Sequence, residues 1–196
     1  MSETPPFYLQ KGNVFAVPVI HYNMEFSAHV FKVLNHIKPD CIAVELAETM
    51  QLQLLHAASR LPDISIVLTF DKLNDPLYYL AEPCDPSFEA LRFGLENNIP
   101  SFCIDLDVDY YPDIKEHFPD PYAIYRIGLK QYFELYSETN KKHGLPKMKV
   151  DMDREHYMAK RLKELSLCYD KVLFITGMSH AESVLELLER SSYPKL

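Results

Sequence analysis

The sequence places two histidines and one glutamate at or shortly after the ends of short apolar runs, an arrangement suited to proton transfer or metal binding. His21 follows eight largely apolar residues, and Glu45 follows Cys41-Ile-Ala-Val44 without a break. His180 closes a Gly177-x-x-His turn after a third apolar run. These runs would bury Glu45, and a buried carboxylate is costly unless it is paired or binds a metal. Two neutral histidines and one carboxylate are also ligands that a divalent transition metal accepts while it keeps a position open for water.

Arg154 is the fourth candidate for this site. It lies four residues before Met158, on the apolar side of a predicted helix that ends near Tyr169. Two interpretations remain open at this point. The guanidinium either stabilises negative charge in the site or belongs to a surface arginine whose stem lies on the core. Arg161 lies nearer the edge of the apolar stripe and is a weaker candidate.

Two further carboxylates, Asp71 and Asp105, also follow predicted strands. An aspartate after a strand often caps the next helix, so both are interpreted as caps or turn residues. The remaining histidines have no partner at ligand spacing. They are interpreted as surface or core residues: His29, His36, His56, His117, His143 and His156.

Strands alternate with helices along the chain, which predicts a three-layer α/β/α fold with a central, mostly parallel sheet. The predicted strands are 13–20, 41–44, 64–70, 101–104 and 172–175. The predicted helices are 25–38, 47–59, 86–97, 122–142, one from Asp151 or Asp153 to Tyr169, and one after His180. Residues 72–86 are predicted to form a short helix with loops. The carboxyl ends of parallel strands share one edge of the sheet, where α/β proteins place their ligands. We therefore expect four side chains along that edge: His21, Glu45, Asp105 and His180.

The turn before the last helix has its own local pattern. Gly177 is predicted to break the last strand through backbone angles that are closed to other residues. Ser179 is then predicted to cap the following helix. This turn would position His180 at the carboxyl end of the strand.

Length and composition limit the class of protein. The 196 residues suit one α/β domain, predicted at 13–190, between a lead-in at 1–12 and a tail at 191–196 that is either a chain end or the start of a linker. A formal net charge of -8 argues against nucleic-acid binding. No apolar run approaches the ~20 residues of a membrane span. No glycine-rich phosphate loop occurs, so no nucleotide cofactor is expected.

The cysteines and the N-terminus predict a cytoplasmic protein. None of the four cysteines has a close partner in the sequence, and Cys41 and Cys103 lie in predicted strands, which indicates reduced, buried thiols. The polar, acidic N-terminus lacks the basic then apolar order of a signal peptide.

The order of these motifs resembles the superfamily that joins TraB/PrgY proteins, Tiki proteases, erythromycin esterases and ChaN-type haem-binding proteins. The likeness spans about 14–188. Its motifs are a strand ending at His21, a strand ending at Glu45, an Asn-Asn-Ile-Pro passage from Asn97 to Asp105, Asp153-Arg-Glu-x-x-Met-Ala159, and Gly177-x-x-His180. The chain departs from the pattern at Pro18-Val-Ile-His21, where proline replaces the first glycine. The position of the last residue is compatible both with a longer parent protein and with a small stand-alone member of the superfamily.

The resemblance implies an erythromycin-esterase/ChaN-like fold in which one cleft gathers four residues: His21, Glu45, Arg154 and His180. Tiki-type members are similar in using a glutamate and Gly-x-x-His histidines for metal-dependent peptide cleavage. Erythromycin esterases are thought to hydrolyse a lactone with histidine, glutamate and arginine. ChaN-type members imply that the same sheet can bind a ligand without turnover.

Two classes of function follow. The first is a hydrolase for a small molecule or a peptide. Either His21, Glu45 and His180 hold a divalent metal (Mn, Zn, Co or Fe) that activates water, or a histidine takes a proton from water, Glu45 orients it and Arg154 stabilises the oxyanion.

The second class is a non-catalytic module that binds haem, a metal or another ligand. Four tyrosines near the loop after the fourth strand would line its cleft or only pack: Tyr110, Tyr111, Tyr122 and Tyr125. The sequence determines neither the substrate nor the oligomeric state.

Overall fold

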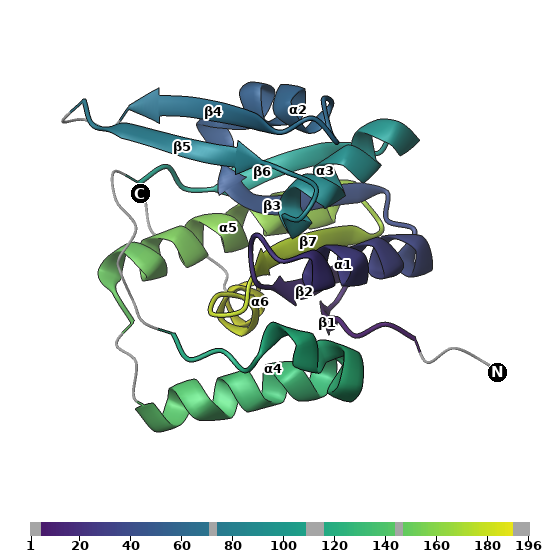
Figure 1. Cartoon of the computed structure of the whole chain (residues 1–196), viewed down its shortest axis with the longest axis vertical. Coiled ribbons are helices and arrows are strands. Elements are labelled where there is room, and N and C mark those ends of the chain that lie inside the picture. Colours follow the sequence, from purple (N-terminus) through teal and green to yellow (C-terminus); the bar gives the residue numbers. More distant parts are fainter. Residues whose placement is uncertain (1–4, 71–73, 109–115, 144–146, 190–196) are drawn as a thin grey trace.

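A five-stranded sheet forms the centre of the protein (Figure 1). The computed structural model describes residues 5–70, 74–108, 116–143 and 147–189. The strand order is β1-β2-β7-β3-β6, and all neighbours except β1 and β2 run parallel. The strands are β1 (Leu9–Lys11), β2 (Val14–Val19), β7 (Val172–Gly177), β3 (Cys41–Ala47) and β6 (Ser101–Asp105).

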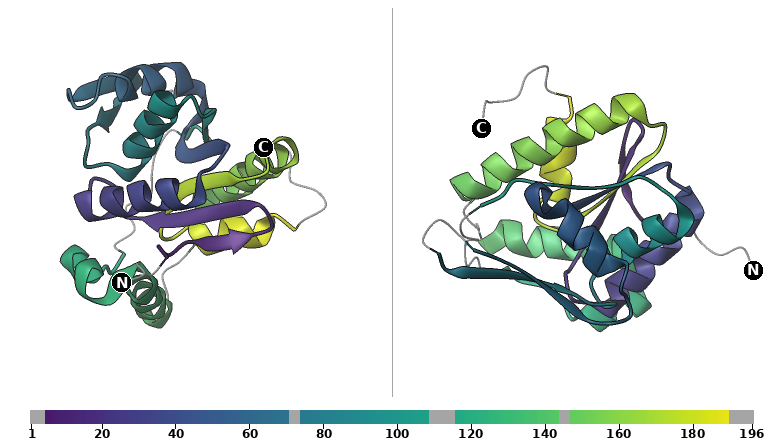
Figure 2. Two further views of the ribbon diagram at one scale, coloured as in Figure 1. Left: turned by 90° about the vertical axis from the view of Figure 1, so that its right-hand side faces the viewer. Right: turned by 90° about the horizontal axis from the view of Figure 1, so that it is seen from above.

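Helices cover both faces of this sheet, so the predicted three-layer arrangement is confirmed (Figure 2). The main ones are α1 (Met24–Ile37) and α3 (Pro86–Asn97) on one side, and α5 (Lys149–Cys168) and α6 (Ala181–Leu187) on the other. Alternate residues of a strand feed the two cores: Ile175 packs with the α1–α3 side and Phe174 with the α5–α6 side. Because the central strands are buried on both faces, they appear in the sequence as unbroken apolar runs.

The third predicted strand does not join the central sheet. It is β4 (Ser65–Phe70), which pairs antiparallel with β5 (Pro76–Ala81) in a separate hairpin. The prediction of a short helix within 72–86 is therefore wrong. β4 has apolar residues on both faces, so its sequence has the pattern of a central strand, although alternate side chains such as Ile66 and Leu68 are exposed. Asp71 lies outside the described residues.

The predicted helix at 47–59 divides into η1 (Glu48–Met50) and α2 (Gln51–Ala58). The predicted helix at 122–142 begins with η2 (Pro121–Ala123) and continues as α4 (Ile124–His143), with a kink at Gly128, where φ is 76°. Such a positive φ suits glycine. Tyr110 and Tyr111 fall outside the described residues, whereas Tyr122 and Tyr125 are 69% and 66% exposed.

Several predicted boundaries are wrong by a few residues. Part of the predicted lead-in forms β1. The N-cap of α5 is Met148, so Asp151 lies inside the helix, and Arg154 is in its second turn. His180, not Ser179, is the N-cap of α6, and Gly177 does not have the positive φ that the sequence suggested. Local propensity does not determine these ends, because tertiary contacts select among neighbouring residues.

The cysteine prediction is confirmed. All four cysteines lie in described parts of the chain and are free, and both Cys41 and Cys103 are buried. Across the described ranges, no helix combines the length and apolar character needed to cross a bilayer.

Candidate active site

Glu45 occupies the centre of the candidate site, near the carboxyl end of β3. Its Oε2 atom accepts hydrogen bonds from the Thr176 hydroxyl and, at 2.8 Å, from the Gly177 N–H on neighbouring β7. Its Oε1 atom accepts from Arg154 Nη2 at 2.6 Å. The pairing of β3 with β6 shifts by one residue just after Val44, and such a bulge re-aims a side chain. Glu45 is therefore buried, as expected, and satisfied by three donors.

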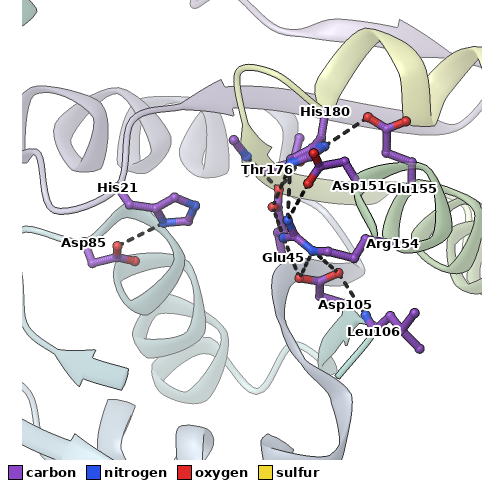
Figure 3. Close-up of polar contacts among 11 residues, drawn as sticks. His21, Glu45, Asp85, Asp105, Leu106, Asp151, Arg154, Glu155, Thr176 and His180 are labelled. Carbon is purple, nitrogen blue, oxygen red and sulfur yellow. Dashed lines mark hydrogen bonds and ion pairs between the residues drawn. The ribbon is translucent and has the colours of Figure 1, made fainter. Parts of the chain in front are cut away.

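Arg154 enters the site from α5 and joins two strands. Its Nε atom donates to Asp105 at 3.0 Å and its Nη2 atom donates to Asp105 at 2.7 Å, while Nη2 also reaches Glu45 (Figure 3). The residue is 6% exposed, so the interpretation as a surface arginine is wrong. The interpretation of Asp105 as a cap or turn residue is also wrong, because its carboxylate is the main partner of the guanidinium. Asp151 lies 3.6 Å from Nη1.

The pKa values of the two carboxylates that share Arg154 shift in opposite directions. Burial alone would raise the pKa of Glu45, but the charges of His180, Arg154 and His21 outweigh burial and lower the pKa below its ordinary value. For Asp105, burial and the negative charge of Glu45 prevail over Arg154, so its pKa is raised. Glu45 is thus the carboxylate that stays ionised as the pH falls.

His180 lies beside this cluster and is held by a second carboxylate. Its Nδ1 atom is 3.0 Å from Glu155 Oε1, and its Nε2 atom is 3.4 Å from Arg154 Nη1. Burial would lower the pKa of His180, but Glu45 and Glu155 outweigh it, and the pKa is raised. Lys147 in turn forms a 2.6 Å ion pair with the other oxygen of Glu155.

His21 stands on another side of the site and has a carboxylate of its own. Its Nδ1 atom is 3.1 Å from Asp85 Oδ2, and Figure 3 shows this pair apart from the Glu45 cluster, with the second ring nitrogen of His21 directed toward it. Asp85 also caps α3 through the N–H groups of Ser87 and Phe88. Burial would lower the pKa of His21, but the hydrogen bond and charge of Asp85 raise it to about 9.

One cleft of about 890 Å³ is lined by both histidines, by Glu45, Asp105 and Glu155, and by Arg154. It opens at the carboxyl ends of β2, β7, β3 and β6, as the alternation of strands and helices predicted. Its charged floor is formed by His21, Glu45, Asp105, Arg154 and His180, and its other walls include Tyr22, Tyr78, Tyr79, Phe118 and Tyr136. Neither Tyr122 nor Tyr125 belongs to the described lining.

No family model matches the chain, and no curated protein or solved structure matches it. The likeness to the TraB, Tiki, erythromycin esterase and ChaN proteins therefore stays a prediction from sequence motifs. What the site does must be argued from its own geometry.

The three predicted metal ligands do not fit a metal ion as they are arranged. Both oxygens of Glu45 already accept hydrogen bonds, and the guanidinium of Arg154, a fixed cation, lies 3.4 Å from His180 Nε2. His21 binds Asp85 through Nδ1 and stands apart from the Glu45 cluster. Within the described ranges, no group of three His, Cys, Asp or Glu side chains is placed to hold a metal. We therefore assign no step to a metal.

The sequence interpretation missed the two carboxylates that orient the histidines. Glu155 lies three residues before Met158 on the same apolar stripe, and this signal would have identified it as buried. Asp85 precedes Pro86 at the start of a helix, a recognisable capping pattern, but nothing local connects it with His21.

Proposed function

We propose that the protein is a hydrolase whose acid–base groups are His21 and His180. A single observation carries the proposal. Two histidines at the ends of neighbouring strands each have Nδ1 bound to a buried carboxylate, at 3.1 Å and 3.0 Å, and both line one cleft. A carboxylate on Nδ1 fixes the ring and its tautomer, which leaves Nε2 for proton transfer.

His180 is the general base in this proposal. In the deprotonated ring, with Nδ1–H donating to Glu155, Nε2 carries the lone pair. Glu45 and Glu155 raise the pKa of His180 in spite of burial and the charge of Arg154, so this base becomes available on the alkaline side of its titration. Neutral His180 takes a proton from water, and the water oxygen forms the new bond to the substrate carbonyl carbon.

His21 is the general acid. Its pKa of about 9 keeps the ring protonated at neutral pH, so Nε2 donates a proton to the leaving oxygen or nitrogen as the bond to the carbonyl carbon breaks. The two histidines exchange their protons with solvent before the next turnover.

Arg154 acts as a positioning residue in this scheme. Its Nε and Nη2 atoms are committed to Asp105 and Glu45, so we do not assign it the oxyanion role that the sequence suggested. It ties the ends of β3 and β6 to α5 and sets the charge beside His180.

The substrate class is a small molecule or peptide with an ester, lactone or amide bond. A cleft of about 890 Å³ suits a drug-sized ligand, and its aromatic walls supply apolar contact. The motif likeness to erythromycin esterases and Tiki proteases supports the same class. We place the activity in the cytoplasm, because four free thiols suit a reducing compartment.

A panel of esters, lactones and peptides, assayed with and without a chelator, tests the proposal. We expect chelator-resistant turnover that falls by roughly 10²–10⁴ in His180→Asn. His156→Asn is the matched control, because this partly exposed histidine on α5 lies outside the described lining of the cleft. Substrate binding without turnover, or full activity in His180→Asn, would contradict the proposal and favour a ligand-binding module.

A further inference from the structure

One face of the β4–β5 hairpin is apolar and open to solvent. Ile64, Ile66, Leu68 and Phe70, here named the hairpin stripe, occupy alternate positions, so their side chains leave the strand on the same face. Their exposed fractions are 64%, 67%, 55% and 55%. Val67, which points the other way, is 9% exposed and belongs to the core. The hairpin is thus packed from one side only, at the margin of the molecule (Figures 1 and 2).

The strand that carries the hairpin stripe lacks the residues that usually prevent an exposed strand from associating with another chain. β4 (Ser65–Phe70) contains no charged residue and no proline. Native proteins usually protect such a strand with a lysine, a proline or a covering element. Pairing with β5 sets Tyr78 opposite Leu68 and Leu80 opposite Ile66, which extends the apolar face onto the second strand.

The exposed area matches what one partner contributes to a stable interface. With about 200 Å² for a fully exposed residue of this size, the hairpin stripe offers roughly 500 Å² of mostly apolar area. A standard interface buries about 800 Å² per partner, of which a little over half, or about 450 Å², is apolar. Apolar patches of this size often mark a binding surface.

We propose that the hairpin stripe is the contact between two copies of this chain. In a two-fold dimer the same patch faces itself, so an uncharged stripe meets an uncharged stripe. The formal net charge of -8 opposes association through most other surfaces, and the stripe lets two copies meet without setting carboxylates against each other. An anionic membrane is a poorer partner, because the same net charge repels it. This contact does not depend on the proposed hydrolase activity.

Analytical ultracentrifugation of the full chain tests the proposal. We expect the wild type to sediment at twice the chain mass of 22.8 kDa. Ile66→Lys and Leu68→Lys should each sediment as monomers while they keep the wild-type circular dichroism. Each variant changes the net charge from -8 to -7, so greater overall repulsion cannot explain the loss of the dimer. Both residues lie on β4, outside the catalytic cleft.

Leu167→Lys is the matched control, because Leu167 is 79% exposed but lies on α5. It should remain dimeric. A wild type that is monomeric at every concentration overturns the proposal, as does a dimer that survives both β4 variants. Co-sedimentation of a monomeric wild type with phosphatidylserine vesicles would also overturn it, and would identify the stripe as a membrane contact.

Discussion

Arg154 Nη2 lies 2.6 Å from Glu45 Oε1, and this ion pair ties α5 to the central sheet where the two side chains are only 7% and 5% exposed. The same guanidinium reaches Asp105 at 2.7 Å. Two strands and one helix therefore share a single buried cation. Removing one partner of such a group leaves a charge without compensation where it is largely shielded from water.

Glu45→Gln keeps the side-chain shape but removes the charge. We expect it to lower the free energy of unfolding by about 2 kcal/mol, less than for an isolated buried pair, because Asp105 still compensates Arg154. Urea denaturation measures this change. Glu186→Gln, on the exposed side of α6, should leave stability unchanged. Equal stability of the wild type and Glu45→Gln would show that the ion pair contributes nothing to the fold.

Arg154→Lys keeps the positive charge but removes the planar guanidinium with its several N–H donors, so it tests geometry separately from charge. A lysine is a point charge and cannot donate to Asp105 and Glu45 from separate nitrogens at once. We expect a loss of stability of about 2 kcal/mol, together with a loss of turnover. Arg126→Lys, on the exposed surface of α4, is the control and should behave as wild type. If both variants retain full stability, the bidentate contact has no structural role.

The His21–Asp85 pair predicts how stability depends on pH. The pKa of His21 is raised from 6.5 to about 9, so the folded state holds this proton more tightly than the unfolded chain. The stabilisation is fully present below pH 6.5 and is lost as the pH rises through 9. We expect the free energy of unfolding to fall by about 2 kcal/mol over this range, because a side chain that is 33% exposed is partly screened.

Asp85→Asn isolates the contribution of this pair. It should flatten the dependence of stability on pH between 6.5 and 9, and the part that remains comes from His180, whose pKa is also raised. His56→Asn, which replaces an exposed histidine on α2, is the control and should keep the wild-type slope. An identical slope in Asp85→Asn and wild type would contradict the assignment.

Lys147→Met tests whether Glu155 tunes His180. Lys147 lies 2.6 Å from Glu155, which binds the ring at Nδ1, so loss of the cation leaves more negative charge beside the imidazole. We expect a further rise in the pKa of His180, seen by NMR titration and as a shift of the basic-group limb of the pH–rate profile to higher pH. Lys149→Met, whose lysine pairs with Asp153 on the surface, should shift neither.

Metal addition tests whether the predicted ligand set exists in solution. Both oxygens of Glu45 are occupied by donors, so we expect Zn²⁺ or Mn²⁺ to change the melting temperatures of wild type and Glu45→Gln equally. A ligand that binds the folded state raises its melting temperature. Stabilisation of wild type that disappears in Glu45→Gln would restore a metal site at His21, Glu45 and His180.

The sequence alone determined that four polar side chains would meet at one edge of a parallel sheet. A strand buried on both faces is mostly apolar, so an ionisable residue after such a run lies at or near its end, although β3 continues for two residues beyond Glu45. This reasoning found His21, Glu45 and His180, and it placed Asp105 correctly while assigning it the wrong role. It failed for β4, because an apolar strand of a one-sided hairpin has the same composition as a central strand.

Only the tertiary structure decided which of these groups are partners. The order β2-β7-β3-β6 is not the order of the chain, and it brings Thr176 and Gly177 beside Glu45, 131 and 132 positions away. The path of α5 across the sheet then decides that Arg154 bridges two carboxylates and that Glu155 reaches His180. Local sequence patterns report burial and backbone preference, whereas pairing of charges depends on distances between elements that no local pattern contains.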